Sequence, residues 1–108
     1  MPALIDNETW LIETSDAIIA KRARLGVASL TSVERLIYCV WVADYGMRNA
    51  GDLATAFVVY PAFQEEAISI AKSLFLPITL ETFSLLPDEL ETLYFDRFAG
   101  VCNEIRNY

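Results

Sequence analysis

The chain has 108 residues and a net charge of −7, from 15 acidic and 8 basic side chains. This length fits one domain spanning residues 1–108, and the acidic balance argues against direct binding to nucleic acid or to an anionic membrane surface. The sequence contains no histidine. It therefore lacks the commonest general base and the usual zinc ligand, and we expect neither an enzyme nor a metal or cofactor site.

The first predicted helix covers about residues 8–25, with Asn7 as its N-cap and Gly26 as its C-cap. The second begins at a capping box in which Thr31 caps and Glu34 reaches back. This second helix, about residues 32–45, is apolar on nearly all sides. A helix of that kind is usually buried, so we expect it at the centre of the core.

The segment from Gly46 to Asp52 interrupts the helical pattern and predicts a turn. Asp52 is then expected to cap a short helix over residues 53–59. Pro61 suits the first position of a fourth helix that runs to about residue 76. Pro77 should end that helix, because proline cannot continue it.

Thr79 is expected to cap a short fifth helix over residues 80–85, and Pro87 opens a last helix that runs to about residue 107. Gly100 inside that helix predicts either a close helix–helix contact or a kink. The predicted fold is all-α, a single compact bundle of five to six helices around the central apolar helix at about residues 32–45.

Acidic side chains are densest at the start of the last helix. Negative charge there stabilises the helix dipole, and the same charge would also form a docking face for a basic partner. Glu65 and Glu66 at the head of the fourth helix have the same two interpretations. A pair of catalytic carboxylates is a third alternative. The candidates in the last helix are Asp88, Glu89, Glu91 and Asp96.

Asn49 and Asp52 are polar residues in the predicted turn between apolar helices. One interpretation is a helix connection with capping side chains. The other is a recognition loop, because loops often carry binding residues. We include both residues among the candidate partner contacts.

No apolar run is long enough to span a bilayer, and the N-terminal residues do not resemble a secretory signal, so we expect a cytoplasmic protein. Cys39 and Cys102 lie in apolar helical patterns. In a reducing compartment they are expected to be free, buried thiols. The spacing of the two residues neither requires nor excludes a disulfide.

Residues 30 to about 83 resemble the DNA-mimic-protein-like family of small helical bacterial proteins. The similarity rests on Leu30-Thr31 with Glu34-Arg35, on Trp41, on the turn 49–53 and on Phe57. Ala50 and Leu53 depart from the glycine and aromatic residue of the family's turn. The resemblance implies an all-helical fold whose acidic surface imitates DNA phosphates, and it also fits immunity proteins that inhibit toxins.

These features together favour a small acidic module that masks a basic surface of a partner protein, either a nucleic-acid-binding protein or a toxin. Charge would steer the encounter, and burial of apolar contacts would follow. Hydrophobic residues make up 55% of the chain. That excess supports an alternative, a structural or assembly protein that forms a homodimer.

Overall fold

The computed structural model describes residues 5–108 and confirms the all-α prediction. No strand occurs among these residues. Residues 5–108 form six α-helices and one short 3-10 segment. They are α1 (Asn7–Leu25), η1 (Val27–Ser29), α2 (Ser32–Ala50), α3 (Ala54–Val59), α4 (Phe63–Ser73), α5 (Pro77–Phe83) and α6 (Pro87–Arg106).

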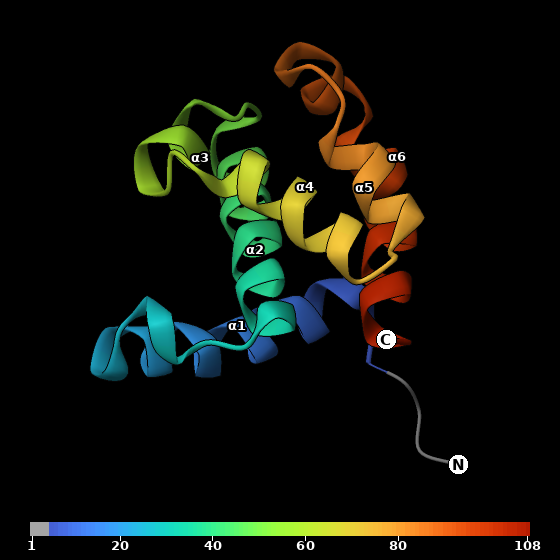
Figure 1. Cartoon of the computed structure of the whole chain (residues 1–108). Helices are drawn as coiled ribbons and strands as arrows, with labels where there is room; N and C mark the ends of the chain where they lie inside the picture. The colour runs from blue at the N-terminus through green and yellow to red at the C-terminus, as the bar shows by residue number, and fades with distance from the viewer. Residues whose placement is uncertain (1–4) are drawn as a thin grey trace.

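Helix α2 is the centre of the bundle, as its apolar sequence predicts. It contacts α1, α3, α4 and α6, and α5 packs between α4 and α6 (Figure 1). Ten of its residues are buried, among them Leu36, Val40 and Val42. Burying a side chain of this kind stabilises the fold by about 1.5–3 kcal/mol, so α2 organises the core.

The start of α1 differs by one residue from the prediction. Asp6, not Asn7, is the N-cap, and its carboxylate accepts the Thr9 N–H at 2.8 Å. That hydrogen bond also lowers the pKa of Asp6. The Gly26 C-cap and the Thr31–Glu34 capping box of α2 are confirmed.

The end of α2 lies beyond the predicted break. The helix continues through Gly46 to Ala50, and Gly51 caps it with a left-handed φ of 74°. Gly46 serves packing: a Cβ there would lie 3.0 Å from the Asp52 carbonyl oxygen and 3.2 Å from the Ala56 nitrogen. The glycine therefore lets α3 approach α2, which its interpretation as a helix breaker missed.

The boundaries of α4 and α5 also differ from the predictions. Helix α4 begins at Phe63, two residues after Pro61, and ends at Ser73, short of residue 76. Pro77 ends no helix; it occupies the first position of α5. That position suits proline, because the first helical N–H has no acceptor within the helix.

Both ends of α5 are capped by side chains of its neighbours. Thr79, the predicted cap, lies buried inside the helix. Glu104 of α6 instead accepts the N–H groups of Ile78 and Thr79 at 2.9 and 2.8 Å. At the other end the Gln64 amide of α4 donates to the carbonyl oxygens of Phe83 and Leu85. A distant acidic residue thus replaces the expected local cap.

Helix α6 opens at Pro87 as predicted and buries its apolar stripe. A Cβ on Gly100 would lie 3.2 Å from a methyl group of Ile78 in α5, so the close-contact interpretation of this glycine holds. Cys39 and Cys102 are free and buried, also as predicted, and burial raises the pKa of Cys102 to about 12. Within residues 5–108 no helix has both the length and the apolar character to cross a membrane.

Replacing Gly46 with alanine should destabilise the protein. The added Cβ meets backbone atoms that cannot move independently, and overpacking of about 1–3 kcal/mol outweighs the gain of about 1 kcal/mol in helix propensity. Urea unfolding should therefore show a net loss of about 1 kcal/mol.

Gly100→Ala is the matched control, because its Cβ meets only a methyl group of the partly exposed Ile78. Its free energy of unfolding should stay close to wild type. An equal loss in both variants would contradict the packing role of Gly46.

Candidate functional site

Three of the predicted acidic contacts lie exposed on the outer side of α6. Asp88, Glu89 and Asp96 make no ion pair among the described residues. Asp88 and Glu89 also line a shallow hollow together with Thr92 and Leu93. We call Asp88, Glu89 and Asp96 the α6 acidic strip. The strip extends about 12 Å along the helix, at a rise of about 1.5 Å per residue.

Glu91 is engaged by the fold and does not belong to the strip. Its carboxylate accepts the Leu53 N–H at 2.8 Å and is partly buried. This bond holds the start of α3 against α6 and places the α2–α3 connection, with Asp52, beside α6. A partner could reach the Glu91 carboxylate only by competing with that backbone donor.

Glu65 and Glu66 are adjacent in sequence but occupy different environments. Glu65 is exposed and makes no ion pair among residues 5–108. Glu66 is partly buried, accepts the Arg35 Nε–H at 2.9 Å and also accepts the Tyr60 hydroxyl. Burial, reinforced by Glu66, raises the pKa of Tyr60 to about 12. Helix α4 thus offers one free carboxylate where the sequence predicts two.

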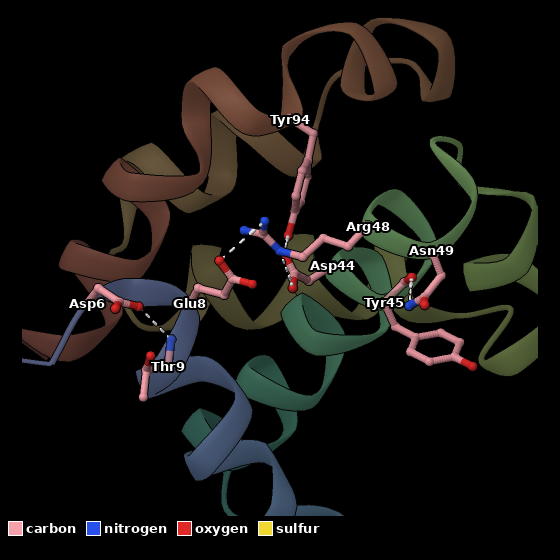
Figure 2. A network of polar contacts seen from close by, with 8 residues as sticks. All are labelled: Asp6, Glu8, Thr9, Asp44, Tyr45, Arg48, Asn49 and Tyr94. Carbon is pink, nitrogen blue, oxygen red and sulfur yellow. Dashed lines mark hydrogen bonds and ion pairs between the residues drawn. The ribbon is translucent and has the colours of Figure 1, made fainter.

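Asn49 and Asp52 make local contacts around the end of α2. The Asn49 amide donates to the Tyr45 carbonyl oxygen at 2.8 Å (Figure 2). The Asp52 carboxylate accepts the Ala54 N–H at 3.0 Å. Asn49 lies inside α2 and not in the predicted turn, and the N-cap of α3 is Leu53 and not Asp52, because α3 begins at Ala54. The Asp52 carboxylate still satisfies the first N–H of that helix. The role of Asn49 and Asp52 in partner binding stays a prediction.

A buried polar network that the sequence analysis missed joins α2 to α6. Asp44 is 4% exposed, and its carboxylate accepts the Tyr94 hydroxyl at 2.7 Å. The Nε–H of Arg48 donates to both carboxylate oxygens, at 3.1 and 3.0 Å. Figure 2 shows the three side chains converging between the two helices. Burying a carboxylate without hydrogen-bond partners costs free energy. Asp44 can therefore lie in the core only because Tyr94 and Arg48 donate hydrogen bonds to it.

Arg48 extends the network to a third helix. Its Nη1 lies 3.6 Å from a carboxylate oxygen of Glu8 in α1, and its guanidinium faces the rings of Phe95 and Phe98 in α6 at 5.1 and 5.0 Å. One cation therefore connects α1, α2 and α6. Burial raises the pKa of Asp44, and the hydrogen bond from Tyr94 and the charge of Arg48 oppose that rise.

The sequence did contain a signal for this network. Asp44 and Arg48 stand four residues apart, the spacing at which an acid and a base meet on one helix face. Ending the predicted helix near residue 45 separated the two residues and hid the pair. The contribution of Tyr94 was not readable, because its position in the α6 stripe looks the same as that of any buried aromatic residue.

The described residues offer no evident centre for metal chemistry. Within residues 5–108 no group of three or more acidic or cysteine side chains lies together so as to hold an ion. Asp44, the acid whose pKa burial raises, is enclosed by Tyr94 and Arg48. The arrangement offers an exposed acidic strip outside and a structural carboxylate inside.

Comparison of the chain with family models, with curated proteins and with solved structures finds no match. No relative therefore contributes a function or a set of site residues.

Tyr94→Phe should lower the free energy of unfolding by about 1–3 kcal/mol, because it removes a donor from a buried carboxylate. Tyr45→Phe is the control. The Tyr45 side chain is partly exposed and points away from the network in Figure 2. Equal stability of the two variants in urea unfolding would contradict the role of the Tyr94 hydroxyl.

Asp44 should also give the protein a recognisable pH dependence. Its pKa is raised in the fold above the ordinary 3.8, so above that pH the native state keeps a proton that the unfolded chain has released. The stabilising contribution of Asp44 is therefore largest in acid and falls as pH rises from about 3.8 through the raised pKa.

The measurement compares the wild type with Asp44→Asn by urea unfolding across this pH range. The stability of the wild type relative to the variant should decrease as pH rises and then become constant. An increase with pH would mean that Arg48 and Tyr94 outweigh burial and lower the pKa of Asp44.

Proposed function

We propose that this protein is a binding module whose α6 acidic strip masks a basic surface of a partner protein in the cytoplasm. The partner is a nucleic-acid-binding protein or a toxin, and the module acts as an inhibitor of the DNA-mimic or immunity type. No catalytic step is part of this proposal.

The observation that carries the proposal is the unpaired charge of Asp88 and Asp96; the third strip residue, Glu89, also accepts the Leu86 N–H at 3.3 Å. Asp88 and Asp96 point to the outer side of α6 with no basic side chain paired to them among residues 5–108. Exposed charge of one sign attracts a partner of opposite sign and raises the association rate. The candidate acids Glu66 and Glu91, by contrast, are already engaged within the fold.

Apolar side chains beside the strip supply surface that a partner can bury, which exposed charge alone does not provide. Phe95 is 50% exposed and follows Asp88 by seven residues, so the two share one side of the helix. Leu86, just before α6, is 69% exposed. Binding energy at protein interfaces is usually concentrated in a few apolar anchors surrounded by polar contacts. The strip with Phe95 and Leu86 has that composition.

The resemblance of residues 30–83 to the DNA-mimic-protein-like family supports the same class of function. All three residues of the strip lie outside that range, so the resemblance and the surface are separate arguments. The net charge of −7 agrees with both.

Affinity capture from a lysate of the native organism, at low and high salt, tests this function. The wild type should retain a basic protein that is released as salt rises, because salt screens exposed charges. Asp88→Asn combined with Asp96→Asn should reduce the retained amount about tenfold, a loss of roughly 1.4 kcal/mol of binding free energy.

The matched control is Glu13→Gln combined with Asp16→Asn. It removes the same number of exposed charges from α1, where neither acid makes an ion pair among the described residues. Capture by this variant should equal that of the wild type. If both double variants lose capture equally, net charge and not the α6 strip is responsible, and the assignment of the site is wrong.

A further inference from the structure

The connection from α4 to α5 holds a phenylalanine in a conformation that normally favours glycine. The Leu76 N–H donates to the Ala71 carbonyl oxygen at 2.9 Å, and the Phe75 N–H approaches that of Lys72 at 3.4 Å. This is the Schellman pattern, whose left-handed residue is usually glycine. Phe75 occupies that position with φ of 59°, and it is the only non-glycine residue with positive φ among residues 5–108.

The side chain of Phe75 makes no buried contact that offsets the strain of this backbone conformation. A side chain with a Cβ is disfavoured in the left-handed region, and glycine would adopt it freely. The Phe75 ring is 87% exposed, so it gains almost no burial within the chain. Backbone strain that the fold does not repay suggests a role outside the monomer.

Beside the ring lies an apolar groove formed by the end of α4 and the start of α5. Its lining has a single charged residue, Lys72. We call it the Phe75 groove. The lining residues are Ala71, Lys72, Phe75, Leu76, Pro77 and Leu80.

We propose that the Phe75 groove pairs with the same groove of a second copy of this chain. A two-fold interface brings one patch against itself, so that patch must carry both a projecting and a receiving feature. The Phe75 groove has both, an exposed ring and an apolar hollow beside it. Each ring would then enter the hollow of the other copy and gain the burial it lacks in the monomer.

Charge favours a second copy over a basic partner at this place. Two chains of net charge −7 repel each other wherever their acids meet, but the lining of this groove presents no acid. Its one cation, the exposed Lys72, can keep its ammonium group in water while its stem packs in the contact. The neighbouring acids of α5 and α6 are engaged: Glu81 pairs with Arg97 at 3.0 Å, and Glu104 accepts two N–H groups of α5. The groove is thus a place where an acidic copy can approach with little repulsion.

The pairing is independent of the proposed function, because it uses α4 and α5 and leaves the α6 acidic strip free. The groove is lined by six residues, far fewer than the roughly 20–30 residues a side of a standard interface. We therefore expect a weak, concentration-dependent dimer.

Sedimentation velocity from about 1 µM to about 1 mM protein tests the pairing, since weak dimers have dissociation constants in this range. The wild type should shift from monomer to dimer. Phe75→Gly should weaken association at least about tenfold and also raise the urea midpoint, because glycine relieves the strain. The combination of weaker pairing with a more stable monomer excludes misfolding as the cause.

Val58→Ala is the control, because Val58 is 82% exposed on α3, away from the groove, and its loss should leave the dimer unchanged. A wild type that stays monomeric at every concentration would overturn the proposal, and so would a dimer that Phe75→Gly leaves intact. A monomeric wild type that captures another protein through Phe75 would assign the groove to a different occupant. Asp88→Asn combined with Asp96→Asn should still dimerise, so the two proposals fail separately.

Discussion

The structure depends on a carboxylate in the core of the bundle. Asp44 is acceptable there because Tyr94 and Arg48 supply the hydrogen bonds that water would otherwise make. A buried ion pair adds little net stability, but it is strongly destabilising when one partner is missing. The network therefore penalises any arrangement of α2 and α6 in which the three side chains do not meet. A purely apolar core would discriminate less strongly between this arrangement of α2 and α6 and other arrangements of the two helices.

Local features of the sequence were enough to predict most of the fold. The Thr31–Glu34 capping box, Pro87 and the apolar faces of α2 and α6 act over one or two turns and were read correctly. The errors arose where a distant residue decides the outcome. Gly46 serves a contact with α3, and Glu104 caps α5 from twenty-five residues away. Neither partner can be located from spacing alone.

The candidate site, like the fold, could be predicted only in part from the sequence. Sequence shows how many acids the chain carries, but it does not show which of them the fold uses. Glu66 and Glu91 are engaged by Arg35 and by the Leu53 N–H. Asp88 and Asp96 are exposed, and no basic side chain among residues 5–108 pairs with them. Exposure, not acidity, separates binding candidates from structural acids.

The capping of α5 from both sides has a kinetic consequence. A helix of seven residues cannot persist alone, since too few hydrogen bonds offset the cost of nucleation. Gln64 and Glu104 satisfy its terminal groups only when α4 and α6 are already in place. Helix α5 therefore forms late in folding, after the long helices assemble. It should also be among the first segments to open when α6 detaches, so that its amide protons exchange with those of the α6 contact as one cooperative unit.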